Sequence, residues 1–79
     1  MTDYDIAKTL DVRGLTCPLV VVKAKKAITE VEPGQVLEVL STDPASKSDI
    51  PAWTKRVGHE LLESLDEGEL YKFYVRRGP

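Results

Sequence analysis

Cys17 is the one residue whose chemistry stands out, because it is the only cysteine among the 79 residues. A single cysteine cannot form an internal disulfide bond. With only one histidine in the chain, it also cannot build a zinc site from cysteine and histidine ligands. Three interpretations of Cys17 follow: a small buried hydrophobic residue, a free surface thiol or a nucleophile. We expect no metal site and no bound cofactor.

The position of Cys17 favours reactivity. It directly precedes Pro18, which suits the first position of a helix because proline has no N–H to satisfy. The sequence therefore predicts Cys17 at the N-cap, where its sulfur could accept hydrogen bonds from the N–H groups of Leu19 and Val20. The positive end of the helix dipole also favours thiolate over thiol. Gly14 predicts a tight turn that delivers the thiol to the helix start.

Residues beside Cys17 could assist it. Arg13 stands four residues before the thiol and could either stabilise an anionic sulfur or form a surface ion pair. Leu19 and Val22 project onto the polar face of the expected helix, next to Lys23. Exposed single apolar residues are common, but two beside a candidate thiol favour a docking patch for a partner protein.

Six short elements must position this site within one domain spanning residues 1–79. Alternation and β-forming residues predict strands at residues 7–12, 35–41, 59–65 and 71–76, and helical periodicity predicts helices at residues 18–31 and 49–57. Parallel strands joined by a helix, followed by an antiparallel hairpin, give a mixed four-stranded sheet. The predicted fold is an α/β (α+β) two-layer sandwich with βαβαββ order and both helices on one face.

Each helix has a predicted buried face. In the first, this face comprises Val20, Val21, Ala24, Ala27, Ile28 and Val31. In the second, it comprises Ile50, Trp53 and Val57, with Ser48 or Asp49 as the cap, Pro51 in the first turn and Gly58 as the terminator. We expect Trp53 to anchor the core and His59 to be solvent-facing or hydrogen-bonded rather than a catalytic base. Asp43 and Asp49 should serve a turn and a cap rather than catalysis.

Size and charge exclude several classes of protein. A domain this small buries only roughly 60% of the surface of its unfolded chain, which leaves no room for a second lobe. Eleven basic and thirteen acidic residues give a net charge of −2, unlike a dedicated nucleic-acid binder. The acidic N-terminus lacks the apolar run of a signal peptide, and no stretch approaches the ~20 apolar residues of a membrane span. The expected location is the cytoplasm, without membrane or direct nucleic-acid contact.

Blocks of sequence along nearly the whole chain, from Leu10 to Arg77, resemble the TusA-like (SirA-like) family of small sulfur carriers. They are Leu10 to Pro18 (LDVRGLTCP), Gly34 to Val39 (GQVLEV), Thr42 to Pro44 (TDP), Asp49 to Trp53 (DIPAW), Gly58 to Leu61 (GHEL) and Tyr71 to Arg76 (YKFYVR). The resemblance implies a βαβαββ sandwich in which Cys17 accepts a sulfane sulfur, carries it as a persulfide and passes it to another protein.

The resemblance also implies the partners. Donors in such relays are cysteine desulfurases or rhodanese-like sulfurtransferases, and acceptors serve tRNA thiolation, sulfur oxidation or cofactor assembly. Transfer by thiolate attack needs one accessible sulfur and no second cysteine, which would release the cargo by forming a disulfide. A monomer is the simplest expectation for a carrier that presents one thiol to two partners.

This chain departs from the family pattern Cys-Pro-x-Pro, because Val20 occupies the second proline position. Val20 restores an N–H group near Cys17 that proline would remove. A carrier of this kind is enzyme-like only in forming a covalent intermediate. The alternative is a non-catalytic interaction or regulatory module of the same fold with a structural Cys17. A thiol peroxidase is disfavoured because no general base or resolving cysteine is evident.

Overall fold

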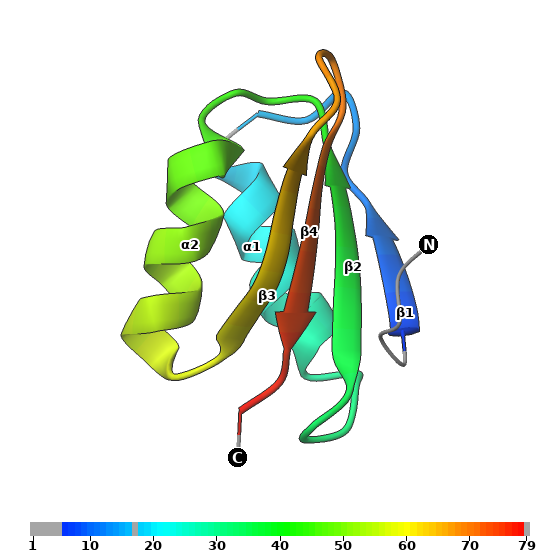
Figure 1. The fold of residues 1–79 in the computed structure, drawn as a ribbon, viewed down its shortest axis with the longest axis vertical. Helices are drawn as coiled ribbons and strands as arrows, with labels where there is room; N and C mark the ends of the chain where they lie inside the picture. The colour runs from blue at the N-terminus through cyan, green and yellow to red at the C-terminus, as the bar shows by residue number, and fades with distance from the viewer. Residues whose placement is uncertain (1–5, 17, 79) are drawn as a thin grey trace.

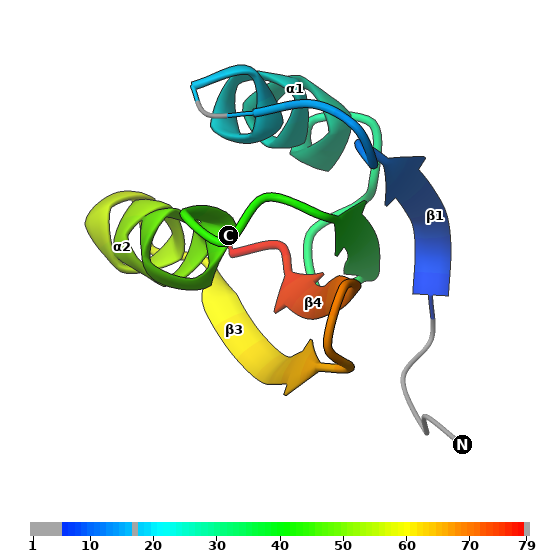
Figure 2. The ribbon, with the colours of Figure 1, turned by 90° about the horizontal axis from the view of Figure 1, so that it is seen from above.

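The structure, a computed structural model, describes residues 6–16 and 18–78. Its elements, in chain order, are β1 (Ile6–Asp11), α1 (Leu19–Ile28), β2 (Val36–Ser41), α2 (Ser46–Val57), β3 (Glu60–Asp66) and β4 (Tyr71–Arg76). The sheet has the order β1-β2-β4-β3, with β1 parallel to β2 and β4 antiparallel to both of its neighbours. Both helices cover one face of this sheet (Figures 1 and 2), which confirms the predicted two-layer βαβαββ fold.

The core lies between the helices and the central strands. Leu37 of β2 and Phe73 of β4 are fully buried and face the helices. Small residues on the inner face of α1, such as Ala24, let the helix approach the sheet closely, and Ile50 and Trp53 fill the space beneath α2. Burying an aromatic or branched side chain stabilises the fold by roughly 1.5–3 kcal/mol. Trp53 is only 4% exposed, so its predicted role as a core anchor is confirmed.

Two ion pairs join the layers. Lys8 Nζ of β1 lies 3.2 Å from a carboxylate oxygen of Glu30, just beyond α1. Lys47 Nζ of α2 lies 2.8 Å from Asp66 of β3. Both pairs are half-exposed, so solvent screens their charges and each adds little to the stability of the fold.

The first helix is shorter than the predicted 18–31 range and runs from Leu19 to Ile28. Beyond Ile28 the N–H groups of Thr29, Glu30 and Val31 each donate to a carbonyl three residues earlier, so the chain tightens from α-helical into 3₁₀-type turns. These turns keep the side chain of Val31 buried, which is why the apolar pattern continues past the end of the helix.

The second helix begins three residues before the predicted 49–57 range, at Ser46. Its first N–H groups donate to the carbonyls of Asp43, Pro44 and Ala45, so the turn runs directly into the helix without a break for a side-chain cap. The predicted caps Ser48 and Asp49 are therefore wrong, because Ala45 occupies the N-cap. Pro51 consequently lies inside the helix rather than in its first turn.

Val57 was expected in the buried stripe of α2 but is 49% exposed, so that expectation is wrong. Thr54, which is 2% exposed, occupies the inward position near the end of α2 instead. Val57 faces the seam between the helices, where it lines a hollow together with Lys25 of α1 and Thr29, the residue that follows α1. Gly58 then ends α2 in the left-handed conformation, as predicted, with φ +86°. The predicted strands agree with the observed ones to within one residue at each end.

Candidate functional site

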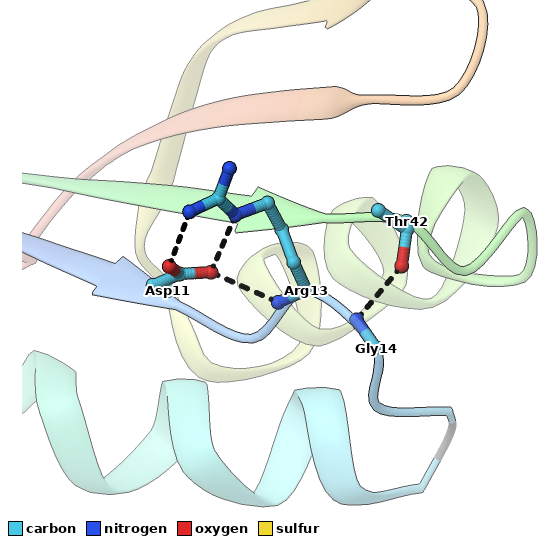
Figure 3. Close-up of polar contacts among 4 residues, drawn as sticks. All are labelled: Asp11, Arg13, Gly14 and Thr42. Atoms are coloured by element: carbon cyan, nitrogen blue, oxygen red, sulfur yellow. Dashed lines mark hydrogen bonds and ion pairs between the residues drawn. The ribbon is translucent and has the colours of Figure 1, made fainter.

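Cys17, the residue on which the sequence analysis centred, lies outside the described residues. The structure does describe both sides of it, residues 12–16 before it and Pro18 and α1 after it. Thr16 and Pro18, its immediate neighbours, are exposed. The site is therefore a surface connection between the end of β1 and the start of α1 (Figure 3).

Backbone geometry makes the turn before this connection specific. Gly14 has φ +84°, a left-handed conformation that L-amino acids with a side chain rarely adopt. Its N–H donates to Oγ1 of Thr42, at 2.9 Å, and the N–H of Leu15 donates to the carbonyl of Val12, at 3.1 Å. Figure 3 shows the side chain of Thr42, the residue that follows β2, directed at the N–H of Gly14 in this loop. The loop is thus held to the neighbouring strand as well as to its own.

Arg13 is engaged by Asp11. Its Nε and a terminal guanidinium nitrogen donate to the two carboxylate oxygens of Asp11, at 2.9 and 2.8 Å, and its backbone N–H donates to the same carboxylate at 3.0 Å (Figure 3). These hydrogen bonds lower the pKa of Asp11 to about 2 and raise the pKa of Arg13. Of the two interpretations of Arg13, the surface ion pair is the one formed among the described residues. The bidentate pair also braces the turn.

The start of α1 differs from the prediction in one respect. Pro18 is the N-cap, with φ −88° and ψ 2°, and its carbonyl accepts the first helical hydrogen bond from Val22 N–H at 3.0 Å. The predicted N-cap position of Cys17 is therefore wrong by one residue. The N–H of Leu19, expected to face the sulfur, instead donates to the carbonyl of Thr16 at 2.9 Å. Proline at the N-cap is possible because that residue precedes the helix and needs no helical φ and ψ.

The predicted docking residues lie on the outside of α1. Leu19 is 49% exposed and Val22 is 55% exposed, and Lys23 beside them is also exposed. Val20, in contrast, is completely buried and packs into the core. The exposure of these side chains agrees with the sequence analysis. Their roles in docking and in positioning a thiolate stay predictions.

The remaining candidates are structural among the described residues. His59 accepts a hydrogen bond at Nδ1 from the N–H of Gly78, at 2.9 Å, and its ring meets that of Trp53 edge-on. Asp43 accepts a hydrogen bond from the N–H of Ala45, as expected of a turn residue. The pKa of His59 is lowered by burial and by the nearby charge of Arg77.

Sequence analysis missed the contribution of Thr42 to the site. A signal for it exists, because β1 and β2 are parallel and their carboxyl ends must meet at one edge of the sheet. The loop after β1 and the residue after β2 are therefore neighbours by topology. It also missed a polar chain on the sheet face away from the helices, where the hydroxyls of Thr9 and Tyr74 both donate to Glu38, at 2.9 and 2.7 Å.

Comparison with solved structures identifies the class of fold. The SirA-like protein of Desulfitobacterium hafniense matches with a TM-score of 0.77 and 28% identity, over 91% of this chain and 99% of that one. The model of the family described as sulfurtransferase TusA matches residues 8–77. The chain belongs to the TusA family.

Curated relatives agree with this assignment. The sulfur carrier protein TusA of Allochromatium vinosum is 43% identical over 98% of this chain and 99% of its own length. That of Pseudomonas entomophila is 40% identical over 98% and 96%. The YrkI protein of Bacillus subtilis is 51% identical over 90% and 95%. These relatives support a sulfur-carrier role. In the part of the chain that the structure describes, no helix is both long and apolar enough to cross a bilayer.

Proposed function

We propose that this protein carries sulfur between two proteins as a persulfide on Cys17. The observation that supports this most directly is that the chain's only cysteine stands in the sequence between exposed Thr16 and exposed Pro18, after β1 and before α1 of a TusA-family domain. Nothing else in the chain can form a covalent bond to sulfur in the same way. The family's relatives named sulfur carriers supply the class of cargo.

The transfer balances without an added oxidant or reductant. The Cys17 thiolate attacks the outer sulfur of a persulfide on the donor protein, the sulfur–sulfur bond of the donor breaks, and the donor's cysteine leaves as a thiolate. In the second step, a thiolate of the acceptor protein attacks the outer sulfur now on Cys17. The Cys17 thiolate is regenerated, and one sulfur atom has moved with no net redox change.

Two features of the site support this chemistry. The start of α1 provides the positive end of a helix dipole beside the connection that contains Cys17, which favours an anionic sulfur there. The turn that precedes Cys17 is braced by the N–H of Gly14 on Thr42 and by the Arg13–Asp11 pair. Arg13 assists through this bracing rather than as a free cation near the sulfur.

The partners follow from the cargo. A cysteine desulfurase or a rhodanese-like protein would supply the sulfane sulfur, and an acceptor protein would pass it to tRNA thiolation, sulfur oxidation or cofactor assembly. Such a relay suits a reducing compartment such as the cytoplasm, because thiols there are kept from forming disulfides.

Mass spectrometry of the intact protein tests the proposal. After incubation with a persulfide-loaded donor, the wild-type protein should gain the mass of one sulfur atom, and a thiol reductant should remove it. Cys17→Ser should gain nothing while unfolding at nearly the same urea concentration as the wild type. Loading of Cys17→Ser would refute the proposal. A wild-type protein that never gains sulfur would also refute the proposal. If Cys17→Ser were in addition strongly destabilised, the result would favour a structural cysteine.

A further inference from the structure

Charge is divided between the two layers of the sandwich. The helices α1 and α2 carry six basic residues and one acidic residue: Lys23, Lys25, Lys26, Lys47, Lys55 and Arg56 against Asp49. The whole chain has eleven basic and thirteen acidic residues, so five basic and twelve acidic residues remain for the strands, loops and ends. The helix layer is therefore strongly positive in a chain whose net charge is −2.

Five of the six helix cations have no ion pair among the described residues. The exception is Lys47, which pairs with Asp66. Outside the helices, the described lysines and arginines each have a partner: four pair with a carboxylate, and Arg77 donates to the carbonyl of Val31. Positive charge without a partner is thus concentrated on one side of the molecule. Like charges gathered on one face repel one another and are stabilised by an incoming anion.

Two of these unpaired cations line a groove between the helices. One hollow, of about 190 Å³, is lined by residues that include Val21, Lys25, Asp49 and Arg56. A second, of about 360 Å³, is lined by residues that include Lys25 and Thr29. The two hollows share Lys25, Trp53 and Val57, so they form one groove along the seam between α1 and α2. Figures 1 and 2 show the two helices lying side by side there.

We propose that this groove, the interhelical groove, binds an acidic segment of a partner protein that also carries an apolar side chain. Half-exposed Val57, together with Val21 and the edge of Trp53, offers an apolar surface, and Lys25 and Arg56 offer charges for carboxylates. Apolar anchors surrounded by charges are typical of protein–protein contacts. A nucleic acid fits this groove less well, because Lys25 and Arg56 are the only cations among the described residues that line it, and Asp49 would repel a phosphate.

Asp49 also sets the orientation of the segment. Among residues 6–16 and 18–78 it is the one acidic residue that lines the interhelical groove, so the partner's carboxylates should lie over Lys25 and Arg56, away from Asp49. Val21 is within one turn of the start of α1, beside the connection that holds Cys17. A segment in the groove would therefore bring its protein next to that connection. The inference deepens the proposed function, on which it rests for the identity of the partner.

The experiment titrates the isotope-labelled, full-length protein with a short synthetic peptide of glutamates interspersed with leucine and phenylalanine. We expect backbone amide signals of Val21, Lys25 and Val57 to shift, and the dissociation constant to rise with salt. The double variant Lys25→Gln with Arg56→Gln should bind about tenfold more weakly, from the loss of two exposed charge pairs. The matched control, Lys26→Gln with Lys55→Gln, removes the same charge from the same helices outside the groove and should change binding less than about twofold.

Several results would overturn the proposal. They are equal weakening by both double variants, no binding by the wild type, or tighter binding of a single-stranded RNA oligonucleotide that shifts the same signals. Loading from the persulfide-loaded donor protein, measured in parallel, separates this proposal from the proposed function. If the wild type binds the peptide but never gains sulfur, the sulfur relay fails and the groove stands. If it gains sulfur but ignores the peptide, the groove proposal fails alone.

Discussion

Replacing Gly14 by alanine should test how the site loop is built. At φ +84° an alanine is strained, yet no heavy atom lies within 4 Å of where its Cβ would be. The cost is therefore conformational and not steric, about 1–2 kcal/mol for an L-residue held in the left-handed region. Gly58 provides a matched control, because it has φ +86° and equally open surroundings but lies at the end of α2.

Both alanine variants should lose the same stability, and only one should lose function. Urea unfolding, followed by the fluorescence of buried Trp53, should show similar losses in the free energy of unfolding for both variants. For a domain of this size, each kcal/mol lost lowers the melting temperature by about 4–8 °C. Loading of Cys17 with sulfur, measured where both variants are folded, should slow for Gly14→Ala only. A changed loop misplaces the reacting group, whereas the end of α2 does not position it.

Gly14→Asn sharpens the test, because asparagine tolerates the left-handed conformation better than alanine and should recover part of the lost stability. Three outcomes would refute the reasoning. Gly14→Ala as stable as the wild type would mean that the turn is not strained by a side chain. A loss well above 3 kcal/mol would mean a steric clash where the structure has open space. If Gly58→Ala also loaded sulfur slowly, the slower loading of Gly14→Ala would be due to lost stability and not to the loop.

Three further predictions concern titration. Burial and a hydrogen bond to a carboxylate raise the pKa of Tyr74 to about 12. The free energy of unfolding should therefore fall by at most about 3 kcal/mol as pH rises from 10 to 12. Absorbance titration and urea unfolding should show this loss for the wild type and not for Tyr74→Phe. Burial lowers the pKa of His59, so the unfolded chain takes up a proton before the folded chain does as pH falls through about 6.5. The free energy of unfolding should therefore decrease in this range. Urea unfolding at pH 7.5 and 5.5 should show the decrease for the wild type and not for His59→Asn. Val20→Pro should cost no hydrogen bond within α1 and should raise the pKa of the Cys17 thiol by removing an N–H near it; an ultraviolet thiolate titration showing no rise would contradict this.

The topology of the fold was predictable because turn residues and periodicity are local signals. Gly58 ends α2 before β3, because glycine readily adopts the left-handed conformation that terminates a helix. Helix ends were less predictable, because they depend on hydrogen bonds between turn and helix. The carbonyls of residues 43–45 accept the first backbone hydrogen bonds of α2 and so extend the helix toward the turn. No side-chain pattern in the sequence predicts this. Pro51 in the helix interior shows that tertiary packing overrode a local preference.

The site was predictable in its chemistry and less so in its bracing. Cysteine before proline at the start of a helix marks the connection from sequence alone. The sequence leaves the partner of Arg13 open, because Asp11 ends β1 and Arg13 lies in the loop after it. Their side chains meet only if the backbone turns there, and that turn is set by Gly14. Thr42 could have been found only from the parallel pairing of β1 and β2, which is a property of the whole fold.

The net charge of −2 does not describe the electrostatic field that a partner meets at the helix layer, because charges act over a limited distance. Salt at physiological strength screens exposed charges beyond about 8 Å, and even the smallest dimension of this molecule is 18 Å. A partner approaching the helix layer is therefore governed by the six cations and one acid of α1 and α2, and not by the acids of the opposite layer. The start of α1 belongs to the same layer, so an acidic partner of the kind proposed would be attracted to the side of the molecule where α1 begins.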